Sequence, residues 1–462
     1  MTRSLRFFAV PLKRVLHAPA PTFGQVMALF SLISVLGLVY LYGAAVMYFR
    51  LPSFDFLDKA FAGAKAWHER GRSTIPFLSP DAAAQIRQGV TVDQAEQTCD
   101  GFTLYTLTSG SRATLIDMRG NVVHRWELPF SRAWSHPSHV ADPLDDEQIH
   151  WFRCYLYPNG DLLAVYHADG DTPYGYGLVK LNKDSKLLWA YAGRVHHDVD
   201  VGEDGMIYTL TQQIVSEPPA GLEFLPTPYI AESLVILSAE GQKLEHIPLL
   251  EAFASSPYAL ALAAVQRPTP SASPNEEKDP LHTNSVKVLR RAWAAKFPLF
   301  RAGQVLISLR NLDTVAVVDQ HTHRVIWAAQ GVWRTQHDAA FLDNGHLLIY
   351  DNCGSEIQTR ILEYDPLTQA IPWAYANENA IRFRARLRGT SQRLSNGNTL
   401  IIDPDQRRLF EVTRSKALVW DYSCPLPLVS TNHPLRGHGV NSARRYRADE
   451  LTFLKGDAHV RP

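Results

Sequence analysis

Two histidines occupy the same position of a repeated pattern. His197 lies eight residues before Gly205, and His337 lies eight residues before Gly345. A third histidine, His282, begins a His-Thr-Asn segment before another apolar run. A neutral imidazole is a nucleophile that can form a covalent intermediate, and a protonated one stabilises developing negative charge. Histidines at one register of a repeat therefore favour a shared chemical site, whereas a single histidine is more often a surface or core residue.

An aspartate follows each of the two aligned histidines, and these pairs have two interpretations. Asp198 and Asp338 could assist the histidines, or they could bond to backbone amides at the start of a strand, as aspartates do in turns. The common register favours the functional interpretation.

These residues lie within a two-part repeat. One unit reads apolar strand, turn, and apolar strand, and five of its six copies end near a tryptophan; it occupies residues 113–128, 177–191, 233–247, 314–329, 360–375 and 408–422. The other unit reads strand, Asn-Gly or Asp-Gly turn, and strand, which is typical of a β-hairpin; it occupies residues 154–167, 198–211, 338–351 and 391–403, with a weaker copy at 300–309.

Each pair of units predicts about four strands, and a four-stranded sheet that recurs radially is a propeller blade. Six copies predict an all-β, six-bladed β-propeller, with a β-sandwich as the alternative. The innermost strand of each blade would line a central channel, which places His197 and His337 there. The insertions 215–232 and 264–280 interrupt the repeat, and the second of them, rich in proline and charge, is expected to be an exposed loop.

The N-terminal segment predicts a membrane anchor. No Asp, Glu, Lys or Arg occurs between Arg14 and Arg50, and residues 26–49 are apolar and long enough to cross a bilayer as a helix. Basic residues precede this run, so the positive-inside rule leaves the N-terminus in the cytoplasm and the rest of the chain outside. We therefore expect a single-pass protein of the bacterial inner membrane whose C-terminal domain lies in the periplasm.

These features predict five segments. They are a cytoplasmic N-terminus (1–25), a transmembrane helix (26–49), a helical juxtamembrane stalk (50–100), the propeller (101–450) and a C-terminal tail (451–462).

Composition and missing motifs exclude several classes. The 46 basic and 46 acidic residues cancel, so no general attraction to nucleic acid is expected. Four cysteines without a C-x-x-C pair do not predict a disulfide scaffold or a zinc ribbon, and at most one disulfide is expected. Neither a phosphate-binding P-loop nor a G-x-G-x-x-G fingerprint is present, so no nucleotide, cofactor or metal is predicted.

The sequence resembles the PAPS-independent arylsulfotransferases, which are six-bladed propellers of the bacterial periplasm. The resemblance covers about residues 100–450. It rests on HHDVDV, HTN, SLRN, QHDAAFLDNGHLLIYDN, SQRLSNGNTLI and SARRY, in this order. The chain differs from soluble members in its anchor and stalk, in lacking a close cysteine pair, and in a short stretch between Arg310 and His337.

The resemblance implies a role for each candidate. His337 would be the nucleophile that is transiently sulfated. The sulfuryl group would be bound by His197, His282, Asn284 and Arg310. The register count adds Thr390 as a further sulfate-binding candidate, because eight residues before Gly397 is Gly389, next to Thr390. Aromatic side chains would hold the phenyl ring, and Phe152, Trp333 and Tyr174 lie in suitable segments.

The predicted function is therefore transfer of a sulfuryl group from an aryl sulfate donor to a phenolic or other hydroxyl acceptor, through a sulfohistidine. The first alternative is a non-catalytic periplasmic propeller that binds a ligand or an envelope partner, because the fold alone does not decide function. A quinoprotein-like redox propeller is disfavoured because vicinal cysteines are absent. Convergence of the candidate residues on one point of the channel would favour the enzyme.

Overall fold

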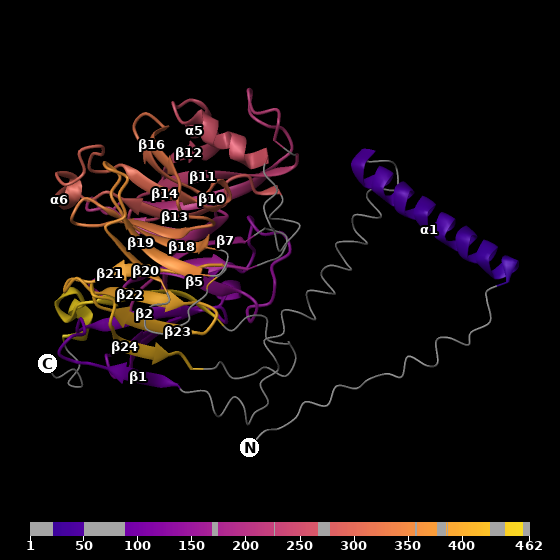
Figure 1. Cartoon of the computed structure of the whole chain (residues 1–462). Coiled ribbons are helices and arrows are strands. Elements are labelled where there is room, and N and C mark those ends of the chain that lie inside the picture. Colours follow the sequence, from indigo (N-terminus) through magenta and orange to yellow (C-terminus); the bar gives the residue numbers. More distant parts are fainter. Residues whose placement is uncertain are drawn as a thin grey trace, which may run out of the picture. The chain divides into compact units, whose positions relative to one another are not determined.

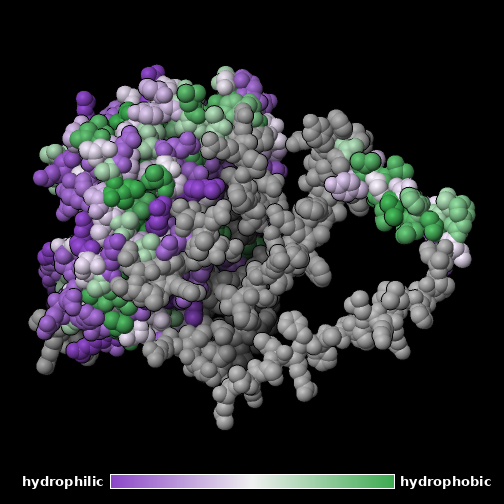
Figure 2. Space-filling model, viewed as in Figure 1, coloured by the Kyte–Doolittle hydropathy of each residue, from purple (hydrophilic) through white to green (hydrophobic). Residues whose placement is uncertain are grey.

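The computed structural model describes residues 22–49, 88–168, 174–225, 227–266, 278–355, 358–376, 385, 387–425 and 439–455. They fall into two units, Met1–Pro80 and Asp81–Pro462. In the first unit, helix α1 (Phe23–Phe49) carries the predicted apolar run, and most of its large apolar side chains from Phe23 to Tyr42 are exposed (Figure 2). Its segment Phe23–Gly43 is long and apolar enough to cross a membrane, and a signal sequence has the same properties.

The second unit is the six-bladed β-propeller that the repeat predicts (Figure 1). Within the described residues, each blade has four strands, named here from the innermost strand outward. The first blade is β25 (Val440–Tyr446), β2 (Phe102–Leu107), β3 (Arg112–Ile116) and β4 (Val122–Glu127), and the second is β5 (His150–Leu156), β6 (Leu162–His167), β7 (Gly175–Leu181) and β8 (Leu187–Tyr191). The third is β9 (Val195–Val201), β10 (Ile207–Val215), β11 (Tyr229–Leu237) and β12 (Lys243–Pro248), and the fourth is β13 (Thr283–Val288), β14 (Val305–Leu309), β15 (Thr314–Asp319) and β16 (Arg324–Gln330). The fifth is β17 (His337–Phe341), β18 (Leu347–Ser355), β19 (Gln358–Tyr364) and β20 (Trp373–Ala376), and the last is β21 (Ser391–Arg393), β22 (Thr399–Asp403), β23 (Arg408–Val412) and β24 (Leu418–Ser423).

Short helices in the connections between strands are α4 (Phe130–Ala133), α5 (Leu249–Ala254), η2 (Ala259–Gln266), α6 (Arg291–Ala294) and η4 (Arg310–Leu312). Two more, η6 (Ala448–Glu450) and η7 (Thr452–Leu454), follow the last strand, β25.

The ring is closed by strands from both ends of this unit. The C-terminal strand β25 supplies the innermost strand of the first blade and pairs with β2 from Phe102 opposite Tyr446 to Leu107 opposite Val440. Strand β1 (Gly89–Asp93) adds a fifth strand to the last blade by pairing with β24, beside which it lies in Figure 1. Both pairings join residues far apart in sequence, so they hold the first and last blades together.

The recurring tryptophans connect neighbouring blades. The indole nitrogen of an outer strand donates to a backbone carbonyl in a turn of the next blade, as Trp126 does to Gly160 at 3.0 Å and Trp189 does to Ala239 at 3.1 Å. Trp420 of the last blade reaches Met118 of the first at 2.9 Å. A buried indole needs a partner for its N–H group, and a tryptophan recurs in the outer strand of five of the six blades, β12 of the third blade being the exception.

The segments that flank the propeller differ from their predictions. Residues 50–87 of the expected stalk lie outside the described residues, and the stalk prediction is wrong for residues 89–93, which form β1 because their backbone groups pair with β24. The expected tail begins with η7, which is held against Pro158 by a hydrogen bond from Thr452 Oγ1 at 2.9 Å. In the insertion 215–232, β11 already begins at Tyr229. Cys99, Cys154 and Cys424 are free and buried.

Candidate active site

A backbone irregularity recurs near the start of five innermost strands. The register of strand pairing shifts in β5 at Phe152, in β9 at His197 and Asp198, in β13 at Asn284, in β17 after His337 and in β25 at Asn441. Such a β-bulge adds a residue that cannot pair and redirects its side chain, and it is often found beside active sites. The aligned candidates therefore lie at equivalent positions, because each of their strands bulges near its start.

Three residues at these positions adopt left-handed backbone conformations. The φ angles are 58° at His197, 49° at His282 and 49° at Asp338. A residue with a Cβ atom is strained in this region by about 1–3 kcal/mol, and such strain clusters at functional sites. Packing of the blades holds these three residues in that conformation.

The hydrogen bonds of His337 fix its tautomer. Its Nδ1 lies 3.1 Å from the Thr335 carbonyl oxygen and 2.8 Å from Asn352 Oδ1. The Asn352 amide nitrogen in turn donates to the Ala385 and Arg388 carbonyl oxygens, at 3.0 and 2.6 Å. Since all of its partners are acceptors, Nδ1 must carry the proton. The lone pair of His337 is therefore on Nε2.

His282 is oriented by a buried carboxylate. Its Nδ1 donates to Asp279 Oδ2 at 2.7 Å, and its backbone N–H donates to Asp279 Oδ1 at 2.9 Å. The Tyr174 hydroxyl also donates to this carboxylate. Burial alone would raise the pKa of Asp279, but attraction to His282 and these hydrogen bonds hold it below its usual value. His282 Nε2 then faces Arg310 Nη1 at 3.2 Å.

A second buried carboxyl group lies behind these histidines. Glu232 Oε2 accepts the Thr283 backbone N–H at 2.7 Å, and Glu232 Oε1 is 3.6 Å from His196 Nε2. Burial, together with the charge of Asp279, raises the pKa of Glu232 well above its usual value. The two carboxyl groups are therefore shifted in opposite directions, and Asp279 is the more acidic of the pair.

The remaining histidines lie against these groups. The Nδ1 atoms of His196 and His197 are 2.8 Å apart, and the rings of His197 and His282 have centroids 4.9 Å apart. Burial, followed by repulsion from His282 and other histidines, lowers the pKa of His197 well below 6.5. Burial and repulsion from Arg310 do the same to His337. We call His196, His197, His282, His337 and Arg310 the histidine cluster.

The other predicted residues occupy different environments. Asn284 donates to the Gln336 carbonyl oxygen at 2.8 Å, and its Oδ1 has no hydrogen-bond partner among the described residues. The Thr390 hydroxyl accepts the Ala443 backbone N–H at 3.2 Å, and no contact joins it to the histidine cluster in the described part of the chain. Sulfuryl binding by Thr390 therefore stays a prediction.

Two of the three predicted aromatic residues lie against the histidine cluster. The rings of Phe152 and Tyr174 have centroids 5.2 and 4.8 Å from that of His197. Trp333 instead packs in the core against Tyr364, with centroids 5.0 Å apart. Trp333 is therefore a core residue, whereas Phe152 and Tyr174 can contact a ring bound beside the histidines.

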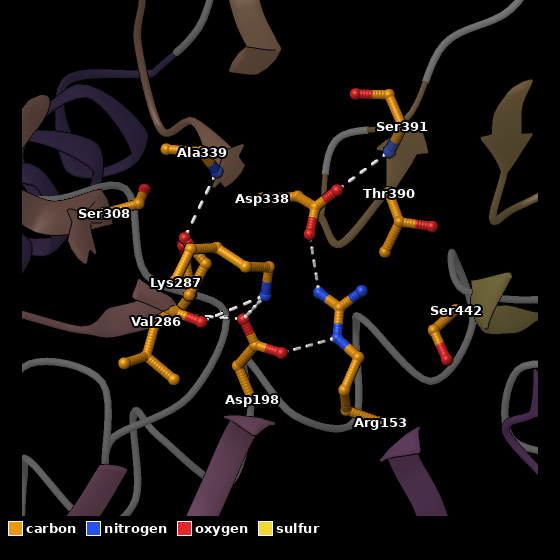
Figure 3. A network of polar contacts seen from close by, with 12 residues as sticks. Arg153, Asp198, Val286, Lys287, Ser308, Asp338, Ala339, Thr390, Ser391 and Ser442 are labelled. Atoms are coloured by element: carbon orange, nitrogen blue, oxygen red, sulfur yellow. Dashed lines mark hydrogen bonds and ion pairs between the residues drawn. The ribbon is translucent and has the colours of Figure 1, made fainter. Parts of the chain in front are cut away.

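The aspartates that follow the histidines form a separate group. Arg153 contacts Asp198 Oδ1 through Nε at 3.0 Å and Asp338 Oδ1 through Nη2 at 2.9 Å, and Lys287 reaches Asp198 (Figure 3). The carboxylates also accept backbone N–H groups, from Val286 to Asp198 and from Ser391 to Asp338, each at 2.9 Å. We call Arg153, Asp198, Lys287 and Asp338 the axial ion network.

This network joins innermost strands of four different blades, and backbone bonding extends it to a fifth through Ser391. Of the two interpretations of the His-Asp pairs, the one in which the aspartates bond to backbone amides is therefore right for Asp198 and Asp338. Each aspartate locks the bulge that follows its histidine.

Sequence reasoning missed several of these residues. Asn352, Asp279 and His196 have clear roles in the geometry, although only Asn352 and His196 stood inside the quoted motifs. The second histidine of HHDVDV was the available signal for His196. Among the described residues, no group of three or more His, Cys, Asp or Glu side chains is arranged to hold a metal ion.

Comparison with protein families gives one match. A family model described as Arylsulfotransferase (ASST) matches residues 154–424, more than half of the chain. This range includes all residues of the histidine cluster. No curated protein matches the sequence.

Solved structures with propeller folds are similar at low identity. A protein of unknown function from Bacteroides caccae is 12% identical with a TM-score of 0.45, over 70% of this chain and 93% of that chain. Virginiamycin B lyase from Staphylococcus aureus is 9% identical with a TM-score of 0.34, over 62% and 73%. A β-propeller domain from Myceliophteria thermophila is 10% identical with a TM-score of 0.39, over 74% and 88%.

Proposed function

The chain belongs to the arylsulfotransferase family, and on this premise we propose that it moves a sulfuryl group from an aryl sulfate to a phenolic or other hydroxyl acceptor through a sulfated His337. The observation that carries the proposal is the hydrogen-bonding of His337. Nδ1 donates to two acceptors, so Nε2 keeps its lone pair for attack on sulfur. The lowered pKa of His337 keeps this nitrogen unprotonated at neutral pH.

The first half-reaction forms the bond between His337 Nε2 and sulfur and breaks the bond between sulfur and the aryl oxygen. The electron pair of the broken bond leaves with the phenolate. Arg310, His282 and His197 surround the position where charge develops on the sulfuryl oxygens, and donors fixed in a buried site stabilise such charge strongly. Asn352 keeps its hydrogen bond to Nδ1 throughout.

The second half-reaction reverses these changes with the acceptor. The acceptor oxygen forms a bond to sulfur and loses its proton to solvent, from which the phenolate released in the first half-reaction takes up a proton. The electron pair of the nitrogen–sulfur bond returns to His337 Nε2. The enzyme then has its starting composition. Asn284 Oδ1 has no hydrogen-bond partner among the described residues, so it can accept from the acceptor hydroxyl; Asn284 and Thr390 are proposed as further contacts to the sulfuryl group or the acceptor.

Mass spectrometry tests the intermediate directly. The protein is mixed with phenyl sulfate without an acceptor, digested at alkaline pH and mapped. We expect an acid-labile sulfuryl adduct on the peptide that contains His337, and its loss when phenol acceptor is added. An adduct on His197 instead would move the nucleophile to the other His-Asp pair. No adduct, with tight binding of aromatic ligands, would favour a non-catalytic binding propeller.

We further propose that α1 is an uncleaved anchor in the bacterial inner membrane and that the propeller lies in the periplasm. The charge asymmetry around the apolar run supports this orientation. A reporter active only in the periplasm, fused after Pro462, is expected to be active and to stay with the membrane fraction. Activity of a cytoplasm-only reporter would overturn the orientation, and a soluble fusion would indicate cleavage.

A further inference from the structure

A second cationic position lies beside the histidine cluster. The Arg388 guanidinium is 5.7 Å from the centroid of the Phe152 ring, and its Nη1 donates to Asn441 Oδ1 at 3.2 Å. Asn441 is itself fixed, because its amide nitrogen donates to the Leu107 and Trp151 carbonyl oxygens at 2.9 and 3.0 Å. The guanidinium is therefore held over one face of Phe152.

Two buried histidines share this position. His150 and His167 are each 7% exposed, and their ring centroids are 5.1 Å apart. His167 also stacks on Phe152 with centroids 4.8 Å apart. Burial, followed by repulsion from Arg388, lowers the pKa of His150 to about 3, and burial with repulsion from His150 and Arg388 lowers that of His167. Both imidazoles are therefore neutral, and each has a nitrogen that can donate a hydrogen bond.

A buried polar atom at this position has no partner. His167 Nδ1 meets no hydrogen-bond partner among the described residues. Leaving a buried donor or acceptor unsatisfied costs about 1–3 kcal/mol, and such an atom in a native protein calls for an explanation. A ligand that contacts this nitrogen would remove the cost.

The position is continuous with the histidine cluster. Phe152 contacts both Arg388 and His197, and His197 contacts His282, which faces Arg310. The Arg388 carbonyl oxygen also accepts from Asn352, the residue that holds His337. Aromatic rings thus separate two arginines, and the backbone of one of them is two hydrogen bonds from the proposed nucleophile.

We propose that Arg388, His150 and His167 form a second anion subsite. This subsite selects aryl substrates that carry a carboxylate or a sulfonate group at the end of the ring opposite the reacting oxygen. This inference rests on the proposed function, because it assigns a substrate class to the same channel. An arginine fork suits such anions, because its two N–H groups can contact two oxygens of a carboxylate or a sulfonate at once. Phe152 and Tyr174 would contact the ring between the two charged ends.

Matched acceptors test the subsite. With phenyl sulfate as donor, kcat/KM is measured for 4-hydroxybenzoate, for 4-hydroxybenzenesulfonate and for 4-hydroxybenzamide, a neutral compound of the same shape as the benzoate. The ratio of each anionic acceptor to the amide is compared between the wild type and Arg388→Gln. We expect this ratio to fall about 10- to 100-fold, the effect of one charge-assisted contact. A ratio that falls for one anion only identifies which anion the subsite takes.

Two controls separate the subsite from general charge attraction. Arg388→Lys keeps the positive charge but loses the planar fork. Its ratio of kcat/KM for the anionic acceptor to that for the amide should lie between those of Arg388→Gln and the wild type. Arg334 is exposed, and Arg334→Gln should leave the ratio within twofold of the wild type. Equal ratios in wild type and Arg388→Gln, or an equal fall in Arg334→Gln, would overturn the subsite.

A binding measurement keeps the two proposals distinguishable. Calorimetry with 4-hydroxybenzoate and the amide needs no turnover. Preference for the benzoate in the wild type, lost in Arg388→Gln, supports the subsite even if no sulfuryl transfer occurs, in which case only the proposed function fails. Sulfuryl transfer without any preference for the benzoate would overturn the subsite and leave the proposed function intact.

Discussion

The histidine cluster and the axial ion network are neighbours in the same channel, but their charges are arranged in opposite ways. In the axial ion network, Arg153 lies between Asp198 and Asp338, and Lys287 also reaches Asp198 (Figure 3). In the histidine cluster, groups that would all be positive when protonated lie together. Their mutual repulsion adds to burial in lowering the pKa values of His197 and His337, which leaves these imidazoles neutral at neutral pH.

This difference separates two roles. Opposite charges that neutralise one another stabilise the structure, but they attract a charged ligand only weakly. A positive group beside neutral donors gains stability when an anion enters, because the anion supplies the opposite charge and accepts their hydrogen bonds. The axial ion network therefore holds the bulges, and the histidine cluster is arranged to favour an anion, which under the proposed function is the sulfuryl group.

The largest expected effect comes from removing the proposed nucleophile. His337→Asn keeps a polar side chain but cannot form the nitrogen–sulfur bond, so we expect kcat for sulfuryl transfer to fall on the order of 10⁴-fold or more, as when other covalent nucleophiles are removed. This kcat is measured by following the release of the phenol from an aryl sulfate in a stopped-flow instrument. His323→Asn, at a half-exposed histidine, is the matched control and should keep wild-type rates. Wild-type activity in His337→Asn would contradict the assignment.

The next effect concerns the other region and is one of stability. Arg153→Met leaves Asp198 and Asp338 buried without their shared partner, which should cost about 3–5 kcal/mol of unfolding free energy. Denaturant unfolding measures it. Arg112→Met removes an exposed pair with Glu127 and should cost no more than about 1 kcal/mol. Similar losses in the two variants would show that the axial ion network does not hold the blades.

The architecture was accessible from the sequence, whereas the bulges were not. Hairpin turns and recurring tryptophans predicted six blades, because each blade repeats the same local pairing. The register count also placed His197 and His337 in the channel. The residues that orient the site histidines were not accessible in this way: Asn352 lies in the strand that pairs with that of His337, and Asp279 lies three residues before His282, inside the insertion 264–280 that interrupts the repeat. The repeat pattern does not extend to such residues, so only the folded structure shows which histidine each one holds.

The His-Asp pairs show the limit of a one-dimensional pattern. Adjacent residues in a strand point to opposite sides unless a bulge intervenes. The sequence therefore could not tell whether Asp198 supports His197 or serves another partner. The structure assigns Asp198 and Asp338 to Arg153 and leaves the histidines to Asn352, Asp279 and one another.

A charge-preserving change tests how the histidine cluster binds an anion. Arg310→Lys keeps the positive charge but loses the planar pair of donors, so turnover should slow about 10- to 1000-fold. Its stability should stay within about 1 kcal/mol of the wild type, unlike that of Arg153→Met. Steady-state kinetics and thermal unfolding of the same preparations measure both quantities. Loss of stability without loss of turnover would place Arg310 with the structural residues.

Removing the residue that fixes the His337 tautomer is expected to lower kcat by a smaller factor. Asn352→Ala removes one of the two acceptors for Nδ1–H and leaves only the Thr335 carbonyl oxygen, so the ring can turn or change tautomer. We expect kcat to fall about 10- to 100-fold, the usual cost of losing a group that orients a histidine. ¹⁵N chemical shifts of the imidazole measure the tautomer independently of the rate. An unchanged tautomer with normal turnover would show that Thr335 alone suffices.

The smallest expected effect is an acid sensitivity that belongs to the histidine cluster. Burial, with repulsion from His282, lowers the pKa of His196 to about 3, while in the unfolded chain it is about 6.5. Below pH 6.5 the unfolded chain binds a proton that the folded chain does not, so stability falls as the pH falls, by about 1.4 kcal/mol per pH unit for this residue.

Asp403 acts in the opposite direction, because burial raises its folded pKa to about 6. The contribution of His196 must therefore be isolated by substituting His196. His196→Gln should therefore lose stability less steeply than the wild type between pH 6.5 and 5, as measured by denaturant unfolding at each pH. Parallel curves for the two proteins would mean that His196 takes up a proton in the folded state, and the histidine cluster would then carry more positive charge than its burial allows.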